Sequence, residues 1–176
     1  MLLHHVTYGP SVKITGATKL NMLGYLGTGF LTIQLGDSIF KAMVPVSLVE
    51  QFSTVRILAL LMPRPELKFA IGYLSCFPRL ERLHVEFGYR WPDLEGARLY
   101  DPLTPIECLD HSLKIIVLRP YEGRSSHVEF ARFFVERARV LEFMEFGNCR
   151  GSTTSWAQDQ HRQLNIENKA SMIAQC

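Results

Sequence analysis

The sequence of 176 residues predicts an α/β fold in which helix-to-strand units repeat along the chain. Three observations lead to this prediction. A pattern of large apolar residues, L-x-x-L-x-L, recurs every 25 to 35 residues, and an amphipathic helical pattern precedes two of its copies. The composition, 47% hydrophobic and 20% charged, is that of a folded domain. Because strands joined through a helix or a long loop pair in parallel, a parallel sheet is expected.

The clearest unit is SSHVEFARFFVERARVLEFMEFG, residues 125–147. Ser126 and Glu129 have the S-x-x-E spacing of a capping box, which predicts that a helix starts there. The helix would bury one apolar face, made of Val128, Ala131, Phe134, Val135 and Ala138. The pattern L-x-x-M-x-F over residues 141–146 then indicates a strand.

A second copy is PELKFAIGYLSCFPRLERLHVEF, residues 65–87. Pro65 is expected at the first helical position, and Pro78 cannot continue the helix. The apolar face would comprise Leu67, Ala70, Ile71 and Leu74. The strand pattern L-x-x-L-x-V over residues 80–85 follows, and the helix-to-strand junction has the same length as in residues 125–147. The two stretches are therefore interpreted as copies of one repeat.

The whole chain contains five good copies of the strand pattern and one weaker copy. The good copies begin at Leu20, Val55, Leu80, Leu113 and Leu141, and the weaker one at Phe30. Their spacing is near the roughly 20 to 29 residues of leucine-rich repeats. Stacked units of this kind predict an irregular leucine-rich-repeat solenoid, with parallel strands on the concave face and helices and loops on the convex face. In the first copy the third apolar position is Tyr25, and a turn is expected between it and Phe30.

The stretch PIECLDHSLKIIVLRPYEGRSSHVEFARFFVERARVLEFMEFG, residues 105–147, carries a recognisable series of motifs. I-E-C-L precedes an L-K-x-x-V-L strand, and a Y-x-G turn, an F-A-x-F-F helix and an A-R-V-L-E-x-M strand follow. These motifs resemble the FBD-type region at the C-terminus of plant, especially grass, F-box proteins with leucine-rich repeats. Residues 54–86 resemble the repeat segment that precedes it in those proteins, and residues 160–171, QHRQLNIENKAS, resemble their closing motif.

The resemblance implies a role in protein recognition. The larger relatives would act as substrate receptors of an SCF-type ubiquitin ligase, in which the F-box binds a Skp-type adaptor. No counterpart of the F-box is found in this sequence, so adaptor binding is not expected. The alternatives are a truncated, ligase-independent scaffold or a non-functional gene product, and more remotely an α/β hydrolase or transferase.

The predicted organisation is one domain over residues 1–176. A leucine-rich-repeat-like segment would cover 1–100, an FBD-like segment 101–147 and a polar C-terminal tail 148–176. Within the first two, residues 88–105 are punctuated by prolines and are expected to form a long loop leading into a short helical turn at 106–109.

Charge and cysteine usage argue against several classes of partner. Basic residues exceed acidic ones by 19 − 17 = 2 and form no long run, so neither nucleic acid nor a membrane surface is an expected partner. No apolar segment reaches the roughly 18 residues of a membrane span. The four cysteines are dispersed, which favours reduced thiols and an intracellular protein of the cytoplasm or nucleus.

The sequence offers no catalytic, cofactor-binding or metal-binding site. The six histidines lack the partner spacing of metal ligands, and no serine or cysteine lies in a nucleophile motif. Gly24, Gly27 and Gly29 have the order G-x-x-G-x-G, which is not the dinucleotide fingerprint. The prediction is therefore a protein that is not an enzyme.

The candidate partner-binding residues are the side chains that alternate with the core positions of the strands. They are Arg82, His84, Glu86, Arg119, Phe143 and Glu145. On the same face, Ile115, Val117 and Phe143 are too apolar to be left exposed together, so some cover is expected. Trp91 and Trp156 lie outside the repeats and are interpreted as local packing anchors.

Overall fold

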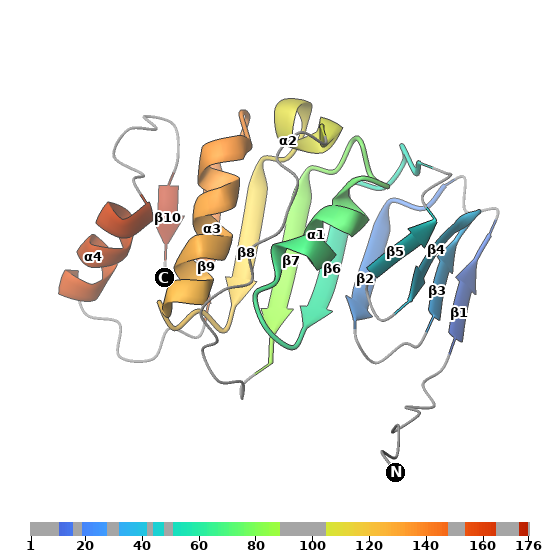
Figure 1. Cartoon of the computed structure of the whole chain (residues 1–176). Coiled ribbons are helices and arrows are strands. Elements are labelled where there is room, and N and C mark those ends of the chain that lie inside the picture. Colours follow the sequence, from blue (N-terminus) through green and yellow to red (C-terminus); the bar gives the residue numbers. More distant parts are fainter. Residues whose placement is uncertain are drawn as a thin grey trace, which may run out of the picture.

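The structure is a computed structural model that describes residues 11–15, 19–27, 32–41, 44–47, 51–88, 105–147, 154–164 and 173–175. The described residues form a mixed α/β fold with two sheets and four helices (Figure 1). The helices are α1 (Leu67–Leu74), α2 (Glu107–His111), α3 (Ser125–Arg137) and α4 (Thr154–Leu164). Among these helices, none combines the length and the apolar character needed to cross a bilayer.

The larger sheet has the strand order β10-β9-β8-β7-β6-β2, and every neighbouring pair is parallel. The strands are β2 (Met22–Gly27), β6 (Ile57–Met62), β7 (Arg82–Phe87), β8 (Ile115–Arg119), β9 (Phe143–Phe146) and β10 (Ile173–Gln175). The five good copies of the apolar pattern supply β2, β6, β7, β8 and β9, each strand beginning two residues after its copy. The predicted parallel sheet is confirmed.

Backbone hydrogen bonds between the units repeat with the same geometry. One carbonyl in each unit accepts hydrogen bonds of 2.8 to 3.2 Å from two successive N–H groups of the next unit. The accepting residues are Asn21, Arg56, Glu81 and Lys114. Each carbonyl lies just before its strand, so the strands start level with one another. The apolar positions of neighbouring strands consequently line up in one core.

The smaller sheet contains β1 (Ser11–Ile14), β3 (Thr32–Leu35), β4 (Ser38–Lys41) and β5 (Val44–Ser47), in the order β1-β3-β4-β5. The β1–β3 pair is parallel, whereas β3–β4 and β4–β5 are antiparallel. The prediction of a sixth repeat beginning at Phe30 is therefore wrong. A two-residue turn, with Gly36 at φ 55°, reverses the chain directly after β3, so this strand forms a hairpin and does not return through a helix. Phe30 itself lies outside the described residues.

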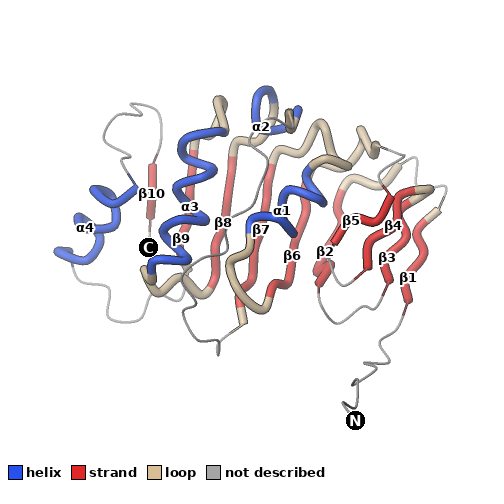
Figure 2. The backbone as a smooth tube through the Cα atoms, in the orientation of Figure 1, coloured by secondary structure: helices blue, strands red, loops and turns tan. Residues whose placement is uncertain are grey.

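Helices α1 and α3 lie over one face of the larger sheet, as Figures 1 and 2 show. The predicted apolar face of α3 is confirmed: Val128, Ala131, Phe134, Val135 and Ala138 are all buried. Helix α1 buries Ala70, Ile71 and Leu74, and its Tyr73 ring stacks on Phe40 of β4 with centroids 4.3 Å apart. This contact joins the smaller sheet to the same core.

Both predicted helix starts need correction. Helix α1 begins at Leu67 after an N-cap at Glu66, so Pro65 precedes the cap and does not occupy the first helical position. Helix α3 begins after Arg124, and no side chain caps it. Ser126 already lies inside the first turn, where its hydroxyl is buried and makes no hydrogen bond to the described residues. The capping box does not form, and the turn before α3 is instead held by His127, whose Nδ1 accepts a 2.9 Å hydrogen bond from the Glu122 N–H.

The expected helical turn at residues 106–109 is present as α2, while residues 89–104 of the preceding loop, including Trp91, lie outside the described residues. The segment 148–176 contains α4 and β10. Trp156 of α4 is half-buried and packs edge-on against Tyr121 with ring centroids 6.1 Å apart. Its interpretation as a packing anchor is confirmed.

Candidate functional site

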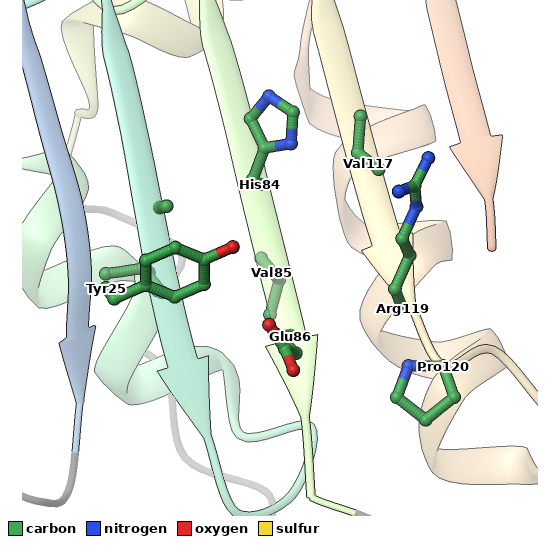
Figure 3. Close-up of a pocket in the computed structure, with 9 residues that line it drawn as sticks. Tyr25, His84, Val85, Glu86, Val117, Arg119 and Pro120 are labelled. Atoms are coloured by element: carbon green, nitrogen blue, oxygen red, sulfur yellow. The ribbon is translucent and has the colours of Figure 1, made fainter. Parts of the chain in front are cut away.

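The larger sheet has one face that no described helix covers, and we call it the outer face. Figure 3 views this face, with the helices behind the strands. All six candidate residues lie on it, on β7, β8 and β9. Register places Arg82, Ile115 and Phe143 in one row across the strands, and His84, Val117 and Glu145 in the next. The sequence periodicity therefore identified a set of side chains that the structure brings together on one surface.

The candidate residues differ in their exposure to solvent. Arg82, Glu86 and Arg119 are exposed, whereas His84, Phe143 and Glu145 are half-buried. The expected cover over the apolar residues is present in part: Val117 is only 4% exposed, while Ile115 and Phe143 keep some exposure. The register places Val117 between the longer side chains of His84 and Glu145, which flank it on both sides.

Arg119 and Glu145 form an ion pair between neighbouring strands. Gly147 makes room for this arrangement, because a Cβ atom there would come within 2.4 Å of the Arg119 side chain. Glu86 is the other acidic neighbour of Arg119 in the register, and no ion pair joins the two. Arg119 thus neutralises the charge of Glu145, and the charge of the exposed Glu86 is not neutralised by Arg119.

His84 has a pKa below its usual value of 6.5. Burial is the largest cause, since it disfavours the charged imidazolium, and the positive charges of Arg82 and Arg119 lower the pKa further. Glu145 opposes the shift and does not overcome it. At neutral pH, His84 therefore stands uncharged among charged neighbours.

Tyr25 is a residue of this face that the sequence interpretation missed. The apolar pattern assigned Tyr25 to the core, but it is 61% exposed, and Leu26 occupies the core position at 4%. The register between β2 and β6 shifts between Leu23 and Leu26, which marks a β-bulge. Gly24 was the available signal, because a glycine inside a strand is often associated with a bulge.

The outer face is hollowed next to Tyr25. The hollow has a volume of about 240 Å³, and we call it the Tyr25 depression. It is lined by Tyr25, Ala59, Leu60, His84, Val85, Glu86, Val117, Arg119 and Pro120. Figure 3 shows the Tyr25 ring lying over β6 with its hydroxyl directed toward β7. The volume is below the roughly 300 to 1,000 Å³ of small-molecule sites and suits one side chain of a larger partner.

At the start of the strands, oppositely charged residues alternate from unit to unit. Arg56 pairs with Glu81 at 3.6 Å, and Lys114 pairs with Glu142 at 3.0 Å. These four residues occupy the same position of successive units. Glu81 and Glu142, which recur in the sequence, therefore contact basic residues of the unit before them.

Two family models match the chain. The first is described as "FBD-associated F-box protein At5g56370, LRR repeats" and matches residues 1–85, and the second, described as "FBD", matches residues 101–146. The chain carries the leucine-rich repeats and the FBD region of FBD-associated F-box proteins. The resemblance seen in the sequence is confirmed. Neither matched model is an F-box, and no curated protein and no solved structure matches the chain.

Both matched regions contribute to the outer face. Tyr25, Arg82 and His84 come from the leucine-rich repeats, whereas Arg119, Phe143 and Glu145 come from the FBD region. The β7–β8 pair joins the two regions within one sheet, so they share a single surface and a single core.

The described residues show little reactive chemistry. Cys76 and Cys108 are buried, and burial raises their pKa values to about 11 and about 12, so both thiols are poor nucleophiles at neutral pH. No group of three or more His, Cys, Asp or Glu within the described ranges could hold a metal ion. His127 packs in the core between Phe87 and Tyr121. Cys149, Cys176, His4, His5 and Gly29 lie outside the described residues.

Proposed function

We propose that the chain is a non-enzymatic protein-recognition module, an irregular leucine-rich-repeat solenoid whose concave sheet face binds the partner. The observation that carries the proposal is the outer face itself. Five parallel strands, β2 and β6 to β9, present side chains there that no described helix covers. In stacked repeats, a face of this kind offers one row of contacts per unit to a partner.

The composition of the outer face supports a protein partner. Met22 and Tyr25 on β2 and Leu61 on β6 are 60%, 61% and 40% exposed, and Leu61 is paired in register with the charged Glu86 of β7. Aromatic residues, methionine and arginine are enriched in protein interfaces. A mixed surface of this kind fits a partner that combines apolar contacts with ion pairs.

By the likeness to F-box proteins, the partner would be a target protein that a ubiquitin ligase modifies. In that arrangement the outer face selects the target, and an F-box contacts the Skp-type adaptor. Residues 1–176 are not expected to bind the adaptor, because neither matched region is the F-box. A ligase-independent scaffold would use the same face, so recovery of adaptor and cullin with the chain separates the two versions.

The leucine-rich-repeat and FBD regions also weigh against a hydrolase or transferase, since such domains are typically non-catalytic. The Tyr25 depression is small, and its polar groups do not form a nucleophile with an adjacent base. Binding is thus the function that the described residues support best.

The test is affinity capture with the full chain, followed by binding measurements with each purified partner. Arg82→Glu combined with Arg119→Glu should weaken the binding of a partner to the outer face by at least about tenfold. The partner's acidic side chains would then meet glutamates in place of arginines. Arg79→Glu combined with Arg162→Glu is the matched control, with the same charge change at exposed positions away from this face. Equal binding by both double variants would remove Arg82 and Arg119 from the interface.

A further inference from the structure

We propose that the Tyr25 depression binds the cationic side chain of a lysine or arginine supplied by a protein partner. This inference rests on the proposed function and adds the chemical class of the residue that anchors the partner. Tyr25, Glu86 and Ala59 line the depression from β2, β7 and β6 and would contact this side chain.

Tyr25 is held in an unfavourable backbone conformation. Its φ is 51°, and among the described residues it is the single non-glycine residue with positive φ. Such a conformation costs free energy and is often found where function requires it. The bulge turns the side chain outward, where 61% of it remains exposed. The bulge thus buries Leu26 in the core and at the same time places the aromatic ring of Tyr25 over β6 (Figure 3).

Glu86 supplies an accessible negative charge at the wall of the depression. The carboxylate is exposed and forms no ion pair within the described part of the chain. Its cationic neighbour Arg119 is engaged by Glu145 on the next strand. His84 adds no competing charge at neutral pH, because its pKa is lowered.

Ala59 explains why there is space for a side chain. On β6 it stands between the larger residues Ile57 and Leu61, which point to the same face, so its methyl group leaves a gap in the row. An incoming lysine or arginine can lay its aliphatic stem on Ala59, beside the His84 side chain of the neighbouring strand. Its charged end then reaches Glu86 and the face of the Tyr25 ring, where ion pairing and cation–π attraction act together. An anionic side chain would meet Glu86 and the already paired Arg119.

The test is an NMR titration of the isotope-labelled full chain with single-residue probes. The probes are N-acetyl-lysine methylamide, N-acetyl-arginine methylamide, and the norleucine and glutamate analogues. We expect saturable shifts of the Tyr25, Ala59 and Glu86 amides for both cationic probes, with Kd values in the millimolar range typical of so small a ligand. Norleucine, which has the stem without the charge, and glutamate should give no saturable shift at these amides.

Glu86→Gln should weaken the cationic probes by at least about fivefold, since it removes the charge and keeps the shape. Glu81→Gln is the matched control, because it is an exposed glutamate of the same repeat outside the depression, and it should bind like the unaltered chain. Three results would overturn the inference: no saturable shifts with the cationic probes, binding of the norleucine analogue as tight as that of the cationic probes, or binding of the cationic probes to Glu86→Gln as tight as to the unaltered chain.

Failure here can be told apart from failure of the proposed function. If the cationic probes do not bind but the Arg82→Glu, Arg119→Glu chain still loses its partner, recognition by the outer face stands and the basic anchor is wrong. If the probes bind but no partner depends on the outer face, the depression binds cations and the recognition function is wrong.

Discussion

The hydroxyl of Tyr121 donates a 3.0 Å hydrogen bond to Oε1 of Gln160, and both side chains are buried. Tyr121 belongs to the turn after β8, and Gln160 to α4. The same Gln160 lies against Gly123, where a Cβ atom would come within 2.9 Å of its amide nitrogen. Arg132 of α3 also donates two hydrogen bonds to the carbonyl of Gln163. Helix α4 is thus attached to the FBD core by specific polar contacts, although the FBD match ends at residue 146.

Gln160→Ala should therefore lower the free energy of unfolding by about 1 to 3 kcal/mol, because the Tyr121 hydroxyl would be left buried without its acceptor. Urea unfolding measures the change. Gln158→Ala, an exposed substitution on the same helix, should change stability by less than about 0.5 kcal/mol. Equal effects of the two substitutions would show that α4 does not dock as described.

A second prediction concerns the contact between β2 and β6. A Cβ atom on Gly27 would come within 2.4 Å of the Leu61 carbonyl oxygen, and backbone cannot move aside as a flexible side chain does. Gly27→Ala should destabilise the chain by about 1 to 3 kcal/mol. Gly24→Ala meets no atom within 4 Å and should be neutral within about 0.5 kcal/mol. Thermal unfolding of the two variants tests the pairing of β2, and a reversed order would contradict it.

The titration of His84 provides a third prediction. NMR of its ring protons should give a pKa below 6.5, because burial and the charges of Arg82 and Arg119 disfavour the imidazolium. Between pH 6.5 and the lowered folded-state pKa, the unfolded chain binds more protons than the folded one. Stability should fall as pH decreases through that window and should not change on this account above it.

His84→Gln should remove this contribution, so the variant should lose less stability than the unaltered chain on going from neutral to mildly acidic pH. The effect should be small, because His84 is only half-buried. A pKa at or above 6.5, or the same pH dependence in both chains, would disprove the environment described for His84.

The charge alternation at the strand starts should contribute little to stability. Glu142→Gln breaks the pair with Lys114, and both side chains are more than half exposed, so a cost below about 1 kcal/mol is expected. The cost should fall further at high salt, since exposed pairs are screened. A larger, salt-independent loss would mean that Glu142 does more than pair with Lys114.

Much of the larger sheet could be predicted from the sequence, because each copy of the apolar pattern records which side chains of a strand face the core. Two predictions were wrong, the sixth repeat and the core position of Tyr25, because the same apolar pattern also fits a different structure. The alternation around Ile33 and Leu35 suits a hairpin strand as well as a repeat strand, and the turn at Gly36 decides between them. In β2, Tyr25 and Leu26 are adjacent in the sequence and both could fill a core position, and only the bulge determines which one is buried.

The outer face was predicted from alternation along β7, β8 and β9, but its charge pattern was not. Whether Arg119 pairs with Glu86 or with Glu145 depends on the strand register and on the space that Gly147 leaves. The Tyr25 depression depends on Ala59 standing between two larger residues and on a ring that arrives from another strand. Such features arise from the packing of three strands and have no signature in any one of them.

The most direct test of recognition by the outer face is site-specific photo-crosslinking of the chain to its captured partner. Benzoylphenylalanine is placed at Leu61, which is 40% exposed on the outer face, or at Glu129, which is exposed on α3. We expect the partner to crosslink at the Leu61 position and not at the Glu129 position. Excess unaltered chain should abolish the Leu61 crosslink by competing for the partner. A partner that crosslinks at Glu129 and not at Leu61 would contradict recognition by the outer face.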